Sequence, residues 1–295
     1  MIEVENLRKE YGGFTAVEGS SFSVPEGEVF GVIGPNGAGK TTTLKMLSGL
    51  VEPTSGSARV ADYDAQDPEM REHLGFLPEE SPLYEDMTAV SYLRFFADLY
   101  DVPDDAADSR IHDTLDRLEL DHRDRKIGDM SKGMTRKVAI ARSLVNDPDV
   151  LIYDEPASGL DPLTTNYIIE FTRELAESGK TVVFSAHNLF HVESICDRVA
   201  VMNDGRIVAR GSVETIREEH GRTEYRVYTT VEVPDAVREN GRFRRTVESM
   251  DAVEETRELA EQAGGEVADI ETHTPSLEDI FLDLADESPD VEGRP

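Results

Sequence analysis

The residues Gly34-Pro35-Asn36-Gly37-Ala38-Gly39-Lys40-Thr41 decide the fold, because they read G-x-x-x-x-G-K-T. They follow the apolar run 29–33, which is typical of a buried strand, and precede the helix-compatible segment 42–47. Strand, glycine-rich loop and helix is the context in which this motif binds phosphate. The glycines let the backbone curl so that successive N–H groups point inward, and the positive end of the following helix also attracts phosphate oxygens. The stretch therefore predicts a nucleoside triphosphate site.

Two side chains at the end of this loop are predicted to bind the triphosphate and its metal directly. Lys40 is placed to reach the β- and γ-phosphates, and the Thr41 hydroxyl is placed to ligate Mg²⁺. The predicted phosphate-binding residues are Gly34, Pro35, Asn36, Gly37, Ala38, Gly39, Lys40, Thr41 and Thr42.

The composition is that of a globular protein long enough for one large or two modest domains. Apolar residues make up 38% of the 295 residues. No apolar run approaches the roughly 18–20 residues of a membrane span, and residues 1–5 lack the basic and then apolar layout of a signal peptide. The single cysteine, Cys196, excludes an internal disulfide and fits a reducing compartment. We expect a cytoplasmic protein.

The net charge of −31 is unusually negative for a chain of this length. Its 61 acidic residues outnumber 30 basic ones, and they are spread along the whole sequence rather than gathered in one segment. Such a chain repels itself in dilute buffer. A diffuse excess of this kind indicates adaptation to a salt-rich cytoplasm, as in a halophile, and it argues against a nucleic-acid partner, which would need a basic face.

The hydrophobic pattern changes along the chain. Residues 1–61 are rich in short strands, which predicts an N-terminal antiparallel β subdomain, and residues 88–146 have the period of helices. From residue 149 to 208 strands alternate with helices, as in a doubly wound parallel sheet. We predict an α/β nucleotide-binding domain over 1–218, with a helical insertion over about 79–147.

A different pattern begins after residue 220. Strand-like segments at 225–231 and 266–271 lie on either side of an amphipathic helical segment at 252–262, and Ser276 is a predicted N-cap of a last helix. We predict a small C-terminal αβ domain over 220–286 and a disordered polar tail over 287–295.

A second motif follows the apolar run 150–153 and reads Asp154-Glu155-Pro156. A carboxylate at the end of a parallel strand beside a glycine-rich loop is placed to hold Mg²⁺, and we assign this role to Asp154. Glu155 then stands next to the γ-phosphate, where a carboxylate can orient or deprotonate the attacking water. Alone, these residues would indicate only a strand-ending turn, and the glycine-rich loop favours the catalytic interpretation.

A third motif, Met130-Ser131-Lys132-Gly133-Met134, lies shortly before this strand and starts a helix with Ser131 as its N-cap. Glycine-rich loop, helical insertion, serine-glycine helix start and strand with Asp-Glu, in this order, resemble an ATP-binding cassette (ABC) ATPase. The resemblance covers about residues 1–215 and implies a P-loop NTPase core. In the family signature LSGGQ, Ser131 and Gly133 match, while Met130, Lys132 and Met134 replace leucine, glycine and glutamine.

The resemblance also implies roles for single residues elsewhere. Tyr11 is similar to the aromatic that stacks on adenine, and His187 is similar to the switch histidine that touches the γ-phosphate. Glu79 occupies the place where the family often has a glutamine that contacts Mg²⁺ and the lytic water, so we expect it to bind or sense the metal. The loop 158–161 is similar to the one that passes across the dimer interface.

The function implied is that of an ATP-hydrolysing motor of a membrane transporter. The signature variant and the ending 275–282 resemble the exporter-type branch that serves multidrug, sodium or similar transport. Two cassettes pair head to tail, as a homodimer or with a similar ATPase chain. ATP then lies between the glycine-rich loop of one chain and Ser131 and Gly133 of the other.

The transport path belongs to a separate multi-span transmembrane permease, so the chain lies peripherally on the inner face of the cell membrane. We expect the loop 81–87 and the aromatics Tyr92, Phe95 and Phe96 to form the surface that docks on the permease. The alternative, that these residues form ordinary helix core and a turn, stays open at this point.

Two other functions use the same glycine-rich loop. A soluble ABC ATPase that acts on ribosomes or DNA usually has two cassettes, long coiled coils or basic surfaces, and this acidic single cassette has none of them. A small-molecule kinase would not need the serine-glycine helix start and Asp154-Glu155-Pro156 in this order. Transport is therefore the favoured function.

We predict that salt stabilises this chain. The Debye length falls to about 3 Å at about 1 M salt, which screens the repulsion among the excess carboxylates. The melting temperature, followed by circular dichroism, should therefore rise steadily as KCl is raised from about 0.1 M into the molar range. A melting temperature that does not respond to KCl would contradict the halophilic interpretation.

Overall fold

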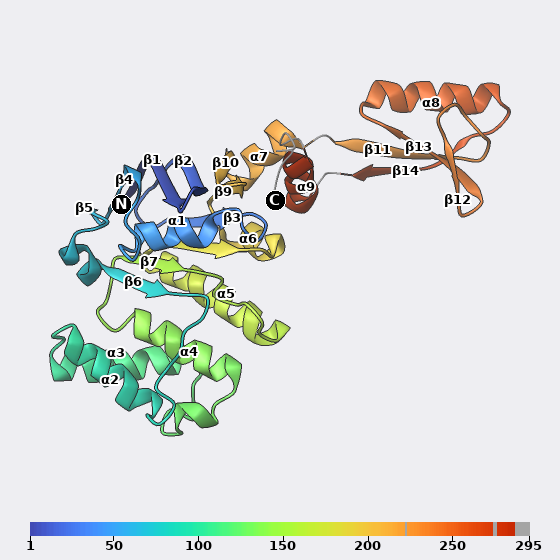
Figure 1. Ribbon diagram of the computed structural model, residues 1–295. Helices are drawn as coiled ribbons and strands as arrows, with labels where there is room; N and C mark the ends of the chain where they lie inside the picture. Colours follow the sequence, from blue (N-terminus) through green and yellow to red (C-terminus); the bar gives the residue numbers. More distant parts are fainter. Residues whose placement is uncertain (222, 274–275, 287–295) are drawn as a thin grey trace. The chain divides into compact units, whose positions relative to one another are not determined.

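The computed structural model describes residues 1–221, 223–273 and 276–286 (Figure 1). The chain forms two compact units, the first over Met1–Ser212 and the second beginning at Val213. The boundary expected from the sequence lies at the end of α7 (Val213–His220) rather than before it, and that boundary stays a prediction. The predicted disordered tail, 287–295, lies outside the described residues. No helix within the described ranges is long and apolar enough to cross a membrane.

The first unit begins with a four-stranded antiparallel sheet, as expected from the sequence. Its strands are β1 (Ile2–Tyr11), β2 (Phe14–Val24), β4 (Ser55–Val60) and β5 (Tyr63–Asp64), in the order β2-β1-β4-β5. Residues on β1 alternate at its start, with Ile2 and Val4 buried and Glu3 exposed, because one face of the sheet covers the core.

The second sheet of this unit is the mostly parallel one that carries the predicted site. It contains β3 (Val29–Ile33), β6 (Leu74–Leu77), β7 (Val150–Tyr153), β8 (Thr181–Ala186), β9 (Arg198–Asn203) and β10 (Arg206–Gly211), in the order β10-β9-β3-β8-β7-β6. Only the β9–β10 pair is antiparallel. Strands β3, β7 and β8 are buried along their whole length, as expected for parallel strands covered on both faces.

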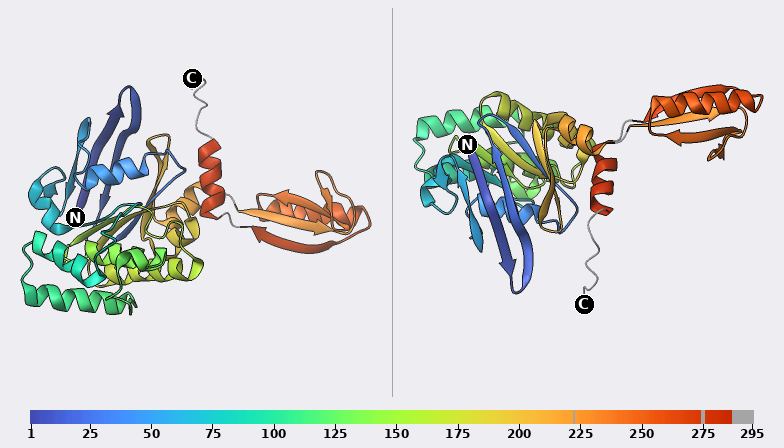
Figure 2. Two further views of the ribbon diagram at one scale, coloured as in Figure 1. Left: turned by 60° about the horizontal axis from the view of Figure 1, so that its bottom comes forward. Right: turned by 90° about the horizontal axis from the view of Figure 1, so that it is seen from above.

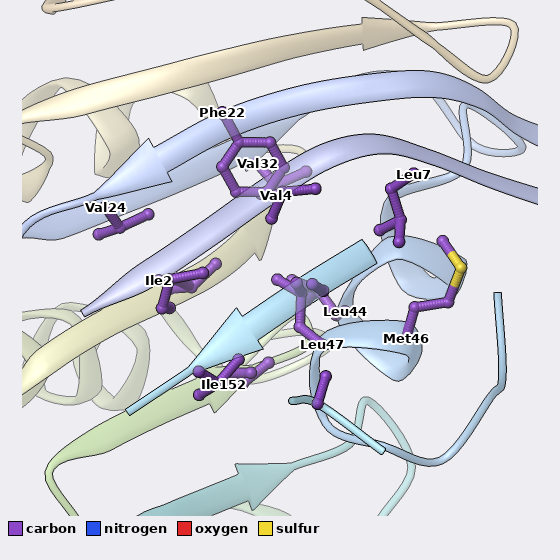
Figure 3. Packing of buried hydrophobic residues seen from close by; sticks show 14 of the residues in the cluster. Ile2, Val4, Leu7, Phe22, Val24, Val32, Leu44, Met46, Leu47 and Ile152 are labelled. Atoms are coloured by element: carbon purple, nitrogen blue, oxygen red, sulfur yellow. The ribbon is translucent and has the colours of Figure 1, made fainter. Parts of the chain in front are cut away.

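Helix α1 (Lys40–Leu47) is held between the two sheets (Figure 3). Leu44, Met46 and Leu47 are fully buried in a cluster with Ile2 and Val4 of β1 and with residues of β3, β7 and β8. Burying a side chain of this size contributes about 1.5–3 kcal/mol. The start of α1, which is also the end of the glycine-rich loop, is therefore fixed by packing on both sides.

The predicted helical insertion forms a layer beside β6, drawn in green in Figure 2. Its helices are α2 (Ala89–Leu99), α3 (Asp104–Arg117) and α4 (Lys132–Ser143), with short 3-10 turns η1 (Pro68–His73) and η2 (Ile127–Asp129) nearby. The buried face of α2 contains Ala89, Tyr92, Leu93 and Ala97, whereas Phe95 is exposed. The apolar spacing thus predicted the helix, but part of the apolar set faces solvent. Helices α5 (Pro162–Glu177) and α6 (Leu189–Ile195) follow β7 and β8.

The second unit is a small αβ structure. After α7, strands β11 (Glu224–Thr229), β12 (Val237–Glu239), β13 (Arg242–Val247) and β14 (Val267–His273) form an antiparallel sheet in the order β12-β13-β11-β14. Helix α8 (Met250–Gln262) packs on this sheet around Val227, Val247 and Val253, and α9 (Leu277–Asp286) ends the described part. The β12–β13 hairpin escaped sequence analysis because the arginines at 242, 244 and 245 disrupt an apolar alternation.

Candidate functional site

A cavity of about 660 Å³ opens in the first unit, at the edge where the parallel strands end. The parallel register brings Ile33 opposite Ala186, and Leu77 opposite Tyr153. The loops that follow these strands therefore meet. The cavity is lined by Phe14, Ala16, Pro35, Asn36, Gly37, Ala38, Gly39, Lys40, Thr41, Thr42, Glu79, Glu155, Ser158 and His187. Residues from five separate segments of the sequence thus form one site.

The glycine-rich loop lies on one side of this cavity, as predicted. Gly39 has a φ of 100°, and a Cβ there would lie 2.5 Å from the carbonyl oxygen of Ala16, so only glycine fits. Gly39 is also the N-cap of α1 and provides no side-chain hydrogen bond. The first N–H groups of α1 are consequently available to phosphate oxygens.

The ammonium of Lys40 belongs to the same loop. Its Nζ donates to the carbonyl oxygens of Gly34, at 2.7 Å, and Pro35, at 3.2 Å. Burial lowers the pKa of Lys40, while the carboxylates of Glu155, Asp154 and Glu79 act in the opposite direction. The ammonium thus lies at the phosphate-binding loop, and a bound Mg²⁺ would offset the negative charge of the three carboxylates.

The two acidic residues at the end of β7 are joined to the end of β8 through Ser185. The Ser185 hydroxyl donates to Asp154 Oδ1 at 2.6 Å and accepts from the backbone N–H of Glu155 at 3.0 Å. Glu155 Oε2 lies 2.8 Å from Nδ1 of His187. The structure therefore brings Asp154, Glu155 and His187 together. Ser185 was missed by sequence analysis, although a hydroxyl within the apolar run 182–186 was a signal.

Glu155 has a strained backbone. Its φ of 47° lies in the left-handed region, which costs a residue other than glycine on the order of 1–3 kcal/mol. The side chain is nonetheless largely buried and faces the cavity. Surrounding contacts must hold this conformation, and one of them is Arg136, which donates to the Glu155 carbonyl oxygen at 2.8 Å. Sequence analysis assigned no role to Arg136.

The residues predicted to bind a metal supply ligands of the type that Mg²⁺ prefers. Thr41 and Glu79 line the cavity, and Asp154 is buried beside Glu155. Together they offer hydroxyl and carboxylate oxygens. No group of three or more His, Cys, Asp or Glu side chains that could hold a metal occurs in the part of the chain that the structure describes. The donor set fits Mg²⁺ only if phosphates and water complete its coordination.

Ser131 and Gly133 are not part of this cavity. Ser131 caps α4 by accepting from the N–H of Met134 at 3.3 Å, as predicted. A Cβ at Gly133 would lie 3.1 Å from Cγ2 of Thr164, so the start of α4 lies against the start of α5. Within one chain, the serine-glycine helix start is thus separate from the glycine-rich loop.

The turn between β1 and β2 carries two exposed aromatic side chains, Tyr11 and Phe14. Tyr11 is 46% exposed, and Lys9 Nζ lies 5.0 Å from its ring centroid. Phe14, which pairs with Tyr11 across the β1–β2 turn, lines the cavity and is 56% exposed. Sequence analysis missed Phe14, because both aromatics lie in the same short segment and only their placement separates them. The role of Tyr11 stays a prediction.

Comparison with known proteins agrees with this geometry. Residues 17–158 match the family described as "ABC transporter". The Nod factor export ATP-binding protein I of Burkholderia orbicola is 39% identical over 220 residues, which cover 74% of this chain and 72% of that protein. An uncharacterised ABC transporter ATP-binding protein of Methanocaldococcus jannaschii is 36% identical over 284 residues, which cover 96% of this chain and 98% of that protein.

The first unit also resembles solved structures. One is the dimeric structure of a post-hydrolysis state of an ATP-binding cassette, bound to ADP and phosphate. It has a TM-score of 0.66 and 26% identity, and the match covers 72% of this chain and 98% of that chain. The α/β fold predicted from the glycine-rich loop is thereby confirmed.

We predict that Phe14 contributes to nucleotide binding. Stacking of an aromatic side chain on a base contributes about 1–3 kcal/mol, so Phe14→Ala should raise the dissociation constant for ADP roughly 5- to 150-fold. Isothermal titration calorimetry in high salt measures this dissociation constant. Tyr11→Ala is the matched control from the same hairpin and should change it less. The opposite ranking would place the base against Tyr11, as the sequence alone indicated.

Proposed function

We propose that this chain, which belongs to the ATP-binding proteins of ABC transporters, powers export through a separate transmembrane permease. It is the ATP-binding and ATP-hydrolysing subunit of such a transporter. The direction of transport is our inference, and it is supported by the relative named for Nod factor export. The signature variant at 130–134 supports it as well.

The pairing of two cassettes is the second part of the proposal, and one observation carries it. Ser131 and Gly133 lie outside the cavity formed by the glycine-rich loop of the same chain. A helix start whose serine hydroxyl and N–H groups can donate hydrogen bonds is suited to phosphate, so a second copy, or a similar ATPase chain, can place it over the bound ATP. The similarity to a dimeric cassette supports this arrangement.

Hydrolysis follows from the groups around the cavity. Lys40 and the first N–H groups of α1 bind the β- and γ-phosphates. The Glu155 carboxylate accepts a proton from the water that attacks the γ-phosphate, and His187, 2.8 Å from that carboxylate, holds it in place. Mg²⁺, held by Thr41 and Asp154 with Glu79 nearby, supplies charge neutralisation on the phosphate oxygens when bound. The dimer would close when ATP binds and open after hydrolysis, and this motion would move the permease.

The docking surface for the permease is proposed at the exposed aromatic residues of the helical layer; Tyr92, which was also expected in this surface, is buried. Tyr84 is 56% exposed, and its ring makes edge contacts with Tyr92 at 5.8 Å and Phe95 at 5.9 Å. Leu99 is also exposed. Exposed apolar side chains gathered in one place are typical of a protein interface. Docked there, the chain would lie on the inner face of the membrane, and its net charge of −31 supports a salt-rich cytoplasm.

We expect Glu155→Gln to separate binding from turnover. The amide cannot accept the proton, so phosphate release should fall by about 10²- to 10⁴-fold, while ATP affinity is retained and a closed dimer accumulates. Phosphate release and light scattering after size exclusion measure the two effects. Glu170→Gln, the same change at an exposed position on α5, serves as the control. Undiminished hydrolysis in Glu155→Gln would remove Glu155 from the catalytic role.

The shared site can be tested by mixing variants. Lys40→Ala damages the glycine-rich loop, and Ser131→Arg blocks the helix start, so each homodimer should be inactive. A mixed dimer keeps one intact site formed by both chains. Co-refolded mixtures should recover about one quarter of the wild-type ATPase rate, since half of the dimers are mixed and each has one of two sites. Failure of every mixture to exceed the separate variants would contradict the head-to-tail homodimer.

A further inference from the structure

Arg136 on α4 has an unusual set of contacts for a charged side chain. It is only 8% exposed. Its Nη1 donates to the carbonyl oxygens of Pro78 at 2.8 Å and Glu79 at 2.9 Å. These two residues form the loop after β6 that brings the Glu79 carboxylate to the cavity. The guanidinium therefore fixes the backbone of one predicted ligand segment.

The other side of the same guanidinium binds the turn after β7. Nη2 donates to the carbonyl oxygens of Asp154 at 3.2 Å and Glu155 at 2.8 Å, and Nε donates to that of Pro156 at 2.7 Å. All five N–H donors of the guanidinium are thus used. The three successive carbonyls surround the left-handed backbone of Glu155. Arg136 consequently stabilises a conformation that the chain would otherwise disfavour.

The nature of these acceptors excludes an ordinary ion pair as the reason for Arg136. All five are backbone carbonyl oxygens, and none is a carboxylate. Burial lowers the pKa of Arg136 to about 10, although the charges of Asp154 and Glu79 act in the opposite direction. The side chain stays protonated at neutral pH. A buried cation is costly unless every donor is satisfied, and a planar fork with five donors is what lysine cannot offer.

We propose that Arg136 is a positioning residue that couples the helix start at Ser131 to Glu79 and Glu155. Ser131 and Arg136 belong to the same rigid helix, so a displacement of α4 moves the guanidinium. The guanidinium then moves both carbonyl-bound segments together. When a partner's ATP engages Ser131, the general base and the metal-sensing residue of this chain are brought to, or taken from, their reactive positions. This inference rests on the proposed function, because it assumes ATP hydrolysis between two cassettes.

The first test compares Arg136→Lys with a matched variant of the same helix. Arg142→Lys is the control, because Arg142 Nη1 donates to the Tyr92 hydroxyl at 3.3 Å and touches neither carboxylate segment. ATP affinity, measured in a Glu155→Gln background, should stay within about twofold, because the phosphates are bound by the glycine-rich loop. The kcat of Arg136→Lys should fall about 10- to 100-fold, since a displacement of about 1 Å can cost this much. Arg142→Lys should keep the wild-type kcat.

The second test detects the coupling without turnover. Hydrogen exchange is followed at residues 78–80 and 154–158 of the full chain, with and without ATP, in Glu155→Gln and in Glu155→Gln/Arg136→Lys. ATP should protect both segments in the first protein and neither in the second, while the start of α4 stays protected in both. This measurement tests whether ATP binding is energetically coupled to residues 78–80 and 154–158 through Arg136, which their closeness in the structure alone does not show.

Each result decides between the alternatives. A kcat of Arg136→Lys equal to that of the wild type, or unchanged protection of both segments, would overturn the inference. A parallel loss of kcat, ATP affinity and melting temperature would also overturn it, because Arg136 would then only hold the fold. If the wild-type chain itself fails to hydrolyse ATP, the proposed function fails, and the exchange of 78–80 and 154–158 without nucleotide still shows whether Arg136 holds them.

Discussion

Parallel strands of a sheet end at one edge, and in this chain β3, β6, β7 and β8 all deliver their following loops to the same cavity. Ile33 lies opposite Ala186, and Leu77 lies opposite Tyr153. A shift of one strand by one residue would turn its side chains to the other face and move one loop by about 3.3 Å. The geometry of every group in the site therefore depends on backbone pairing within this sheet.

The parts of the site that could be predicted are those formed by residues adjacent in the sequence. Gly39 has a positive φ that favours glycine. Asp154 and Glu155 directly follow an apolar strand. In both cases the neighbouring residues are enough to indicate the role. Arg136 could not be found this way, because its partners lie 18 to 58 residues away and are backbone atoms without a side-chain signature. Ser185 offered only a hydroxyl within an apolar run, and its partner Asp154 lies 31 residues away. Phe14 shows the same limit at short range, since only the hairpin's path decides which aromatic faces the cavity.

Salt screens the acidic residues on the surface and the buried charges of the cavity to different extents. The surface carries most of the 61 acidic residues, and salt reduces their repulsion over a few ångströms. Lys40 and Arg136 are buried cations among Asp154, Glu155 and Glu79, and buried charges are screened much less by salt. Adaptation of the surface to salt can therefore proceed without changing the interactions among the charges that line the cavity. The charge of the whole chain is consequently a poor guide to the charge that a ligand meets.

Glu155 combines a strained backbone with a carboxylate that faces the cavity, so the proposed catalytic role depends on the contacts that hold it. Its strained backbone is held by Ser185 on β8 and by Arg136 on α4, while its carboxylate is held by His187. Ser185 and His187 lie at the end of β8, whereas Arg136 lies on α4, and these contacts together help to hold a backbone conformation that is otherwise disfavoured. Of the three, only Arg136 belongs to the helix that starts at Ser131. In the proposed dimer, contact with a second cassette would therefore reach Glu155 through Arg136, whereas Ser185 and His187 contact Glu155 from β8.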